Sequence, residues 1–181
     1  MFDKLVDLLV SFGRMFMFWT VLPAYCSGVI LRFGVFHRLA GPGFHWKWPF
    51  EIETVLSTNV VPETMMVGPQ SLTTKDEVPL VISTVVTFSV SDAKVFLLDI
   101  EGANQVIEDA TYGIVAHMIL EHTWAELLNM DIANELTKTV RRQAKRYGVD
   151  IKQVQLADFT RSRSIRLVQG HASHFAPVKV T

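Results

Sequence analysis

The stretch VPLVISTVVTFSV, from Val78 to Val90, is the strongest constraint on the fold of this chain. β-Branched residues dominate it, and apolar residues fill nearly every position. Such a composition favours a strand over a helix, because branched side chains pack well on a pleated surface. Apolar residues on both faces are typical of a strand that is buried on both faces, so the sequence predicts a central strand here.

The segments before this strand also show a β pattern. Residues 29–36 (VILRFGVF) predict a strand that runs into a turn at residues 39–43, and residues 51–60 predict a further strand. The hydrophobic period in this region is close to two, as expected when one face of a sheet is buried.

The aromatic stretch GPGFHWKWPFE, residues 41–51, lies within this β region. Phe44, Trp46 and Trp48 alternate with polar residues, so we expect them to share one face of a short strand that Pro49 ends. The Gly-Pro-Gly segment predicts the first hairpin turn, with the aromatic strand returning from it. Tryptophan is favoured at membrane interfaces, so we expect this corner to contact lipid as well.

The period becomes helical after residue 90. Ser91 and Asp92 predict an N-cap for a short helix through Leu98, and a long helical pattern starts at about residue 103. The residues expected on the apolar stripe of this helix are Val106, Ile107, Ala110, Ile114, Met118 and Leu120.

The last elements are a capped short helix, a long helix and a strand. Thr123 and Glu126 have the spacing of a capping box. A helix over residues 131–147 stops at Gly148, and a strand over residues 149–159 follows. The residues that this helix should bury are Ile132, Leu136, Val140 and Ala144. Strands, then helices, then one strand predict an α+β fold.

Composition limits the classes of function. A chain of 181 residues is long enough for one domain with an appendage. The net charge of −1 provides no field that would gather DNA or RNA, so we expect no nucleic-acid partner. The single cysteine, Cys26, excludes an internal disulfide and a multi-cysteine zinc site, and indicates a reducing compartment. Cys26 is either a buried thiol or a candidate lipidation site beside a membrane.

Residues 1–16 form an amphipathic pattern on a helical wheel. The polar residues fall within an arc of about 100°. The apolar residues on the opposite face are Phe2, Leu5, Val6, Leu9, Phe12 and Phe16. A face of this width is typical of a helix that lies in a bilayer interface or packs in a bundle.

The apolar pattern continues in the uncharged run of residues 15–31, which Pro23 interrupts. Three membrane interpretations remain: an interfacial amphipathic helix, a re-entrant hairpin bent at Pro23, or a transmembrane helix. The alternative is the first core helix of a soluble fold. The side chains that we expect to contact the bilayer are Phe2, Leu5, Leu9, Phe12, Phe16, Phe18, Trp19, Trp46 and Trp48. Arg32, Arg38 and Lys47 then predict that the domain lies on the cytoplasmic face of the membrane.

No motif indicates catalysis, so we predict that the chain is not an enzyme and binds no cofactor. The sequence contains no nucleophile elbow, no Walker loop and no dinucleotide-binding glycine pattern. His117 and Glu121, with His122 beside them, have a spacing that could bind a metal on a helix, but a solvated or packing face is the favoured interpretation. His171 and His174 have no third ligand nearby in the sequence. We therefore predict no metal site.

A basic cluster lies at the end of the last long helix. A helix C-terminus with a solvated face is the simpler interpretation. The functional hypothesis is an ion-paired contact between subunits, in which acids of one copy meet the cations of the next. The residues in this hypothesis are Arg141, Arg142, Lys145, Arg146, Glu101, Glu108 and Asp109.

The ordered set of segments resembles the SPFH or band 7 domain of stomatins, prohibitins and flotillins. Residues 32–50 (RFGVFHRLAGPGFHWKWPF) are similar to the opening of that domain, and residues 71–98, with Thr-Lys-Asp before an apolar strand, are similar to its most recognisable stretch. EHTWAELL, residues 121–128, precedes a long helix and a strand in the same order as in stomatin-like proteins. The resemblance covers residues 28 to 160.

The resemblance implies a non-enzymatic scaffold that assembles side by side on a bilayer into a ring or cage and organises lipid and membrane proteins. It also implies partners: further copies of the chain, lipid, and a membrane-bound AAA protease or another membrane protein. A regulator that restrains such a protease and a lipid or small-ligand binding module are the alternatives. The family's long Ala/Glu-rich helix does not follow residue 160 here, so we expect an open ring or a smaller oligomer.

We therefore divide the chain into three parts. Residues 1–28 are expected to form a membrane-associating segment, residues 29–160 the SPFH domain, and residues 161–181 a short C-terminal tail.

Overall fold

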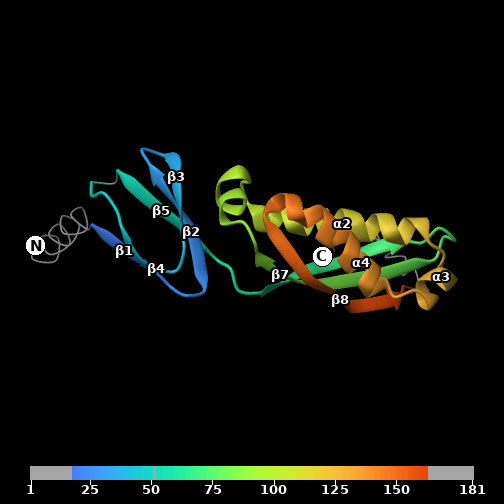
Figure 1. The fold of residues 1–181 in the computed structure, drawn as a ribbon. Helices are drawn as coiled ribbons and strands as arrows, with labels where there is room; N and C mark the ends of the chain where they lie inside the picture. The colour runs from blue at the N-terminus through green and yellow to red at the C-terminus, as the bar shows by residue number, and fades with distance from the viewer. Residues whose placement is uncertain (1–17, 51, 163–181) are drawn as a thin grey trace, which may run out of the picture.

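The structure is a computed structural model that describes residues 18–50 and 52–162. Residues 18–59 form a small β unit and residues 63–162 form a larger α/β unit. The two units lie end to end, with β1 and α3 near opposite ends of the molecule (Figure 1). The fold is α+β with antiparallel sheets, as predicted.

Two sheets make up the β unit. Its strands are β1 (Trp19–Leu22), β2 (Cys26–Arg32), β3 (Val35–Ala40), β4 (Gly43–Trp46) and β5 (Glu53–Asn59). β1 pairs with β4, and β2 lies between β3 and β5 in an antiparallel sheet. The residues buried in its small core are Leu22, Ile30 and Ala40, with Val55 packed against them.

The first hairpin turn is not where the sequence pattern predicted it. Phe33 and Gly34 have φ angles of 50° and 78°, and they reverse the chain between β2 and β3. Positive φ at both central residues is typical of a two-residue hairpin whose twist matches that of the strands. The predicted strand over residues 29–36 is therefore interrupted.

The Gly-Pro-Gly segment connects two different sheets. β3, which precedes it, pairs with β2, whereas β4, which follows it, pairs with β1. The prediction that residues 41–43 form the first hairpin turn is therefore wrong. The reason is that the partner of β4 comes from the start of the described chain, and local turn chemistry carries no information on such pairing.

The apolar run of residues 15–31 is largely β structure. Residues 1–17 lie outside the described part of the chain, and with them the predicted helix and its contacts at Phe2, Leu5, Leu9, Phe12 and Phe16. From residue 19 onward the run contains β1, which pairs with β4, and β2, which pairs with β3 and β5. Helical or re-entrant interpretations of residues 19–31 are therefore wrong.

Two further facts bear on the predicted membrane segment. The boundary that we expected after residue 28 lies inside β2. Among the described residues, no helix combines the length and the apolar character needed to cross a membrane.

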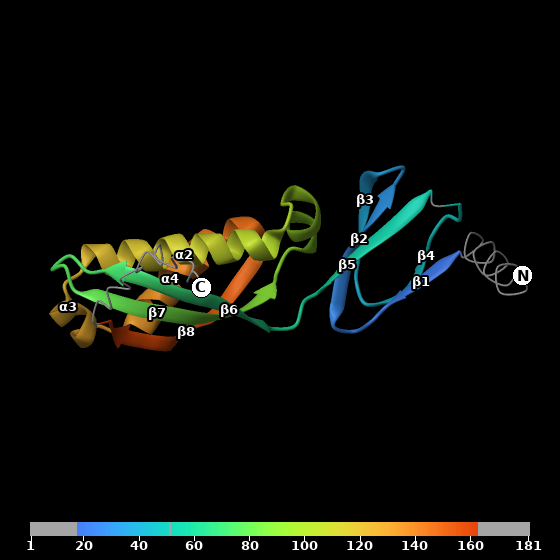
Figure 2. The same ribbon diagram turned by 180° about the vertical axis from the view of Figure 1, so that it is seen from behind.

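The α/β unit is a three-stranded sheet with helices on one face. Its strands are β6 (Glu63–Thr73), β7 (Pro79–Val90) and β8 (Val149–Arg161), and its helical elements are η1 (Val95–Asp99), α2 (Ala103–Glu121), α3 (Trp124–Asn129), α4 (Ile132–Ala144) and η2 (Lys145–Tyr147). The strand order is β6-β7-β8, so β7 is central as predicted. α2 packs on β6, α4 packs on β8, and the two helices contact each other (Figure 2).

The two faces of β7 are buried to different degrees, so the expectation of burial on both faces is met only in part. Leu80, Ile82, Val86 and Phe88 point into the core beneath the helices and are at most 4% exposed. On the face without helices, Ser83 and Ser89 are buried, whereas Val81, Val85 and Thr87 are half-buried. β6 was not predicted, because a bulge at residues 68–69 (Gly-Pro) interrupts its alternation.

The helices begin where their caps predicted. The Asp92 carboxylate accepts hydrogen bonds from the Lys94 and Val95 main-chain N–H groups at the start of η1. Thr123 and Glu126 form the predicted capping box of α3. The predicted core residues of α4 are all buried: Ile132, Leu136, Val140 and Ala144.

The apolar stripe of α2 lies one position away from the predicted one. The buried residues are Ala103, Ile107, Thr111, Val115 and Ile119. Of the predicted set, Ile107 is buried, whereas Leu120 is 57% exposed. The shift arises because α2 packs on the sheet along one line and on α4 along a neighbouring line.

A few polar contacts join the two units. Asn59 at the end of β5 accepts a hydrogen bond from the Cys26 thiol within the β unit, and its Nδ2 donates to Glu63 Oε1 at the start of β6. The Lys94 ammonium lies over the Phe36 ring, 5.1 Å from its centroid. The described part of the chain thus contains two separate hydrophobic cores, joined by a short linker and these contacts.

Candidate functional site

Apolar side chains cover the outer face of the β1-β4 sheet. Trp19 lies opposite Trp46, and Val21 lies opposite Phe44. Residues directly opposite each other project to the same side of a sheet, so these four side chains share one face. They are 48%, 61%, 65% and 63% exposed, respectively. Phe18 stacks on Trp46 with 5.8 Å between ring centroids. We call Phe18, Trp19, Val21, Phe44 and Trp46 the aromatic face.

The opposite side of the same sheet faces the core of the β unit. Leu22 is 6% exposed and packs with Ile30 and Ala40. The aromatic face therefore points outward, at the end of the molecule farther from α3 (Figure 1). Contiguous exposed apolar surface is typical of a contact with a membrane or another protein. The sequence placed Phe44 and Trp46 together, but only the pairing with β1 adds Trp19 and Val21.

Trp48 lies beyond the end of β4 and is held by a buried carboxylate. Its main-chain N–H donates to Glu53 Oε2 at 3.1 Å. The Arg32 Nε and Nη2 atoms donate to Glu53 Oε1 at 3.0 and 2.7 Å. Glu53 is only 3% exposed. Burial alone raises the pKa of Glu53, but the hydrogen bonds from Arg32 and Trp48 and the charges of Arg32 and Arg38 outweigh it and hold the pKa below its usual value. Sequence reasoning missed Glu53, because nothing local distinguishes it from a surface acid.

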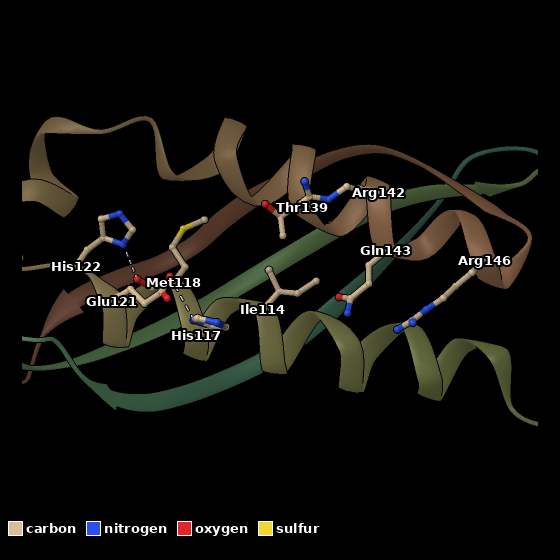
Figure 3. Close-up of a pocket in the computed structure, with 9 residues that line it drawn as sticks. All are labelled: Ile114, His117, Met118, Glu121, His122, Thr139, Arg142, Gln143 and Arg146. Atoms are coloured by element: carbon tan, nitrogen blue, oxygen red, sulfur yellow. Dashed lines mark hydrogen bonds and ion pairs between the residues drawn. The ribbon is translucent and has the colours of Figure 1, made fainter.

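A groove of about 560 Å³ lies between α2 and α4 (Figure 3). Ile114 and Met118 of α2 supply apolar surface, whereas Arg142 of α4 and Arg146 of η2 line the groove from the other side. His117 Nδ1 lies 3.3 Å from Glu121 Oε2.

The histidines of this groove do not form a metal site. His122 Nδ1 is bonded to the Met118 carbonyl oxygen at 2.8 Å. Within residues 18–50 and 52–162, no three His, Cys, Asp or Glu side chains are placed to hold a metal ion. His171 and His174 lie outside the described residues.

The four cations of the basic cluster at the end of α4 and in η2 make different contacts. The Arg141 Nε and Nη2 atoms donate to the carbonyl oxygens of Ile151 and Lys152 at 2.7 and 2.8 Å, where β8 bulges away from β7. Arg141 therefore satisfies the main chain of its own sheet edge. The Arg146 guanidinium lies over the Tyr147 ring at 4.8 Å and also lines the groove. Arg142 and Lys145 are exposed, and their side chains make no hydrogen bond or ion pair with any residue that the structure describes.

The three acids of the predicted subunit contact also differ in their surroundings. Asp109 accepts a hydrogen bond from Gln105 Nε2 at 3.1 Å and lines a hollow together with Arg146 of the same chain. Glu101 and Glu108 make no hydrogen bond or ion pair within the described residues.

Cys26 is a free cysteine that is buried in the β unit. Its side chain is 9% exposed, and the thiol donates to Asn59 Oδ1 at 3.3 Å. This environment agrees with a buried thiol, and we do not carry lipidation of Cys26 forward.

Comparison with known proteins identifies the family. The family model described as SPFH domain / Band 7 family matches residues 20–166, most of the chain. The chain belongs to the SPFH/Band 7 family.

Curated relatives of this SPFH protein carry the name HflK. Protein HflK of Haemophilus influenzae is 28% identical over 158 residues, which cover 76% of this chain and 37% of the relative. The E. coli K12 protein named Modulator of FtsH protease HflK is 26% identical over 131 residues, which cover 68% of this chain and 31% of that protein. This chain thus spans about a third of the length of these relatives.

The motif that carried the family resemblance has a structural role in this SPFH domain. Thr74 Oγ1 donates to the Asp76 carboxylate, and the same carboxylate oxygen accepts the Trp124 main-chain N–H at 3.0 Å. The hydrogen bond from Thr74, with that from Trp124, holds the pKa of Asp76 below its usual value. The Thr-Lys-Asp turn before β7 therefore fastens the start of α3 to the sheet.

Proposed function

We propose that this SPFH protein is a non-enzymatic scaffold that docks on a bilayer through the aromatic face and assembles side by side. The observation that carries the proposal is the aromatic face, because it exposes two indole rings and two phenyl rings beside one another on the β1-β4 sheet. Indole rings partition to the interface between lipid and water, where the ring is apolar and the N–H stays hydrated. The α/β unit would then extend away from the membrane.

A flotation experiment on the full chain tests membrane docking. The double variant Trp19→Ser/Trp46→Ser should bind vesicles of phosphatidylcholine and phosphatidylglycerol at least about tenfold more weakly than wild type, because burial of a large apolar side chain contributes about 1.5–3 kcal/mol. The matched control is Leu120→Ser/Leu128→Ser, which removes side chains that are 57% and 61% exposed on α2 and α3. Wild-type binding by the tryptophan variant, with unchanged circular dichroism, would contradict docking through this face.

The side of the membrane remains a prediction. It rests on Arg32, Arg38 and Lys47, which favour the cytoplasmic face. Arg32 is paired with Glu53, and Arg38 donates to the Trp46 carbonyl oxygen. Protease accessibility of the α/β unit in sealed, oriented membrane vesicles checks this assignment.

The second candidate is regulation of a membrane-bound protease, and the name of the E. coli relative favours it. We propose that the scaffold restrains such a protease by lying beside it in the membrane. In proteoliposomes that contain FtsH, added full-length chain should slow degradation of a membrane substrate several-fold and leave degradation of a soluble substrate nearly unchanged. Equal rates with and without the chain would argue against this role. The third candidate, a lipid or small-ligand binding module, has no specific observation in its favour.

A further inference from the structure

α2 carries a second apolar line beside the one that it buries against the sheet. The residues of this second line, all half-buried, are Val106, Ala110, Ile114 and Met118. The stripe predicted from the sequence falls mainly on this line. Residues 110–120 contain no Asp, Glu, Lys or Arg, so α2 is apolar over a wider arc than the sheet covers. The outer side of a surface helix is normally polar, so the second line indicates a further contact.

The second apolar line of α2 lies along the groove between α2 and α4 (Figure 3). Ile114 and Met118 line the groove itself, and Val106 and Ala110 line a neighbouring hollow of about 430 Å³. Ile114 also lines the hollow, so the two cavities are continuous. Together they follow α2 from Val106 to Glu121, a length of about 22 Å at the rise of an α-helix.

The wall formed by α4 carries polar side chains without partners. Thr139, Arg142 and Gln143 line the groove, and their side chains make no hydrogen bond or ion pair with any residue that the structure describes. Arg146 lines it too, and its guanidinium lies over the Tyr147 ring. Arginine side chains form their strongest hydrogen bonds with carboxylates and phosphates. This wall therefore favours an acidic occupant.

The acids beside the groove do not supply that acceptor. Glu121 is paired with His117 on the same helix. Asp109, at the other end, accepts a hydrogen bond from Gln105. Among residues 18–50 and 52–162, no ion pair joins α2 to α4. The carboxylate that Arg142 can bind must therefore come from outside the described part of the chain.

The position of the groove favours a protein segment over lipid. The groove lies on the α/β unit, whereas the aromatic face lies on the β unit (Figure 1). A bilayer that is contacted through the aromatic face would leave the groove in water. The furrow between two neighbouring helices accepts a third helix, which places one apolar side chain per turn into it.

We infer that the groove between α2 and α4 binds an acidic amphipathic helix of a partner protein. Apolar side chains of that helix pack on Ala110, Ile114 and Met118, and a carboxylate on its flank binds Arg142. The inference goes beyond the proposed function and depends neither on membrane docking nor on assembly of the chain.

Fluorescence anisotropy with the full chain in mild detergent tests this inference. The probe is a stapled, fluorescein-labelled helix of about 16 residues with one leucine per turn, glutamate on one flank and glutamine elsewhere. A second probe has lysine in place of glutamate. We expect wild type to bind the glutamate probe at least about tenfold more tightly than the lysine probe, because only glutamate can accept hydrogen bonds from Arg142.

Variants of the groove locate the binding. Arg142→Glu should reverse the preference between the probes. The matched control Lys145→Glu makes the same change in net charge on an exposed side chain that lines neither the groove nor the hollow, so it should bind like wild type. Gly113→Trp should weaken binding of the glutamate probe at least about tenfold. A Cβ at Gly113 meets no atom within 4 Å, so the indole fills the hollow without straining α2.

Several results would overturn the inference. They are equal affinity of wild type for the two probes, no binding of the glutamate probe, and a Lys145→Glu variant that reverses the preference as Arg142→Glu does. A bound fraction that declines at high chain concentration would assign the groove to a second copy. Displacement of the probe by a short-chain phosphatidylglycerol would assign it to lipid, and either outcome would exclude a partner helix as the occupant.

Discussion

A Gly148→Ala substitution is expected to lower the free energy of unfolding of the α/β unit by about 3 kcal/mol. Gly148 has a φ of 71°, and a non-glycine residue there is strained by about 1–3 kcal/mol. An alanine Cβ would also lie 2.6 Å from the Asp92 carbonyl oxygen. The main chain cannot simply move away, because the Gly148 carbonyl oxygen accepts the N–H groups of Ser91 and Asp92. Urea unfolding followed by circular dichroism at the helical band measures the loss.

Gly113→Ala is the matched control for this substitution. Gly113 lies within α2, and a Cβ there would meet no atom within 4 Å. Alanine is favoured over glycine inside a helix by about 1 kcal/mol, so this variant should be slightly more stable than wild type. Equal urea midpoints for the two variants would show that the close approach of Gly148 to the Asp92 carbonyl oxygen does not restrict the residue at position 148.

Removal of the Glu53 carboxylate is expected to destabilise the β unit by about 2–4 kcal/mol. Breaking one side of a buried ion pair commonly costs about 3–5 kcal/mol, and we expect a smaller loss because the Arg32 side chain is 40% exposed. Glu53→Leu leaves the Arg32 guanidinium and the Trp48 N–H without their acceptor. Tryptophan fluorescence during chemical unfolding reports the change, since Trp19, Trp46 and Trp48 all lie in this unit.

The double variant Arg32→Met/Glu53→Leu separates the ion pair from packing. If an uncompensated charge causes the loss, the double variant should recover part of the stability of the single one. If the double variant is less stable than Glu53→Leu, the unpaired Arg32 charge is not the cause of the loss.

Glu53 also gives the β unit an acid-dependent stability. Its pKa is lowered in the folded chain, so the unfolded chain takes up the proton first as the pH falls. The stabilisation is therefore complete above the unfolded pKa of about 4.3 and is lost as the pH falls through the lower folded value. Glu53→Gln should flatten the acid side of the stability profile of this unit. A profile that stays parallel to wild type would exclude Glu53 as its source.

Local patterns predicted the α/β unit well. The Asp92 cap, the Thr123–Glu126 capping box and the buried stripe of α4 are formed by residues a few positions apart, so the sequence contains both partners of each contact. The strand at residues 78–90 was recognised for the same reason, since its β-branched composition is a local property.

The predictions for the β unit failed where strands pair with segments that are distant in the sequence. The segment containing Trp19 and Val21 looked like part of a membrane helix because its apolar residues are continuous. β4 provides hydrogen-bonding partners for that main chain, which makes it a strand. The candidate site therefore differs from the predicted one. β1 pairs with the aromatic strand and adds Trp19 and Val21 to its exposed face, whereas Trp48 lies beyond the strand, where its main-chain N–H is bonded to Glu53.

The sequence by itself determined the family, the helices with their caps, the central strand and an apolar N-terminal half, because propensity, capping and hydrophobic period act over a few residues. Only the tertiary structure decided which side chains share a surface. It joined Trp19 and Trp46 into one outward face and used Arg141 to hold the main chain of β8. The physical reason is that strand pairing and helix packing connect residues far apart in the chain, and no local pattern specifies those partners.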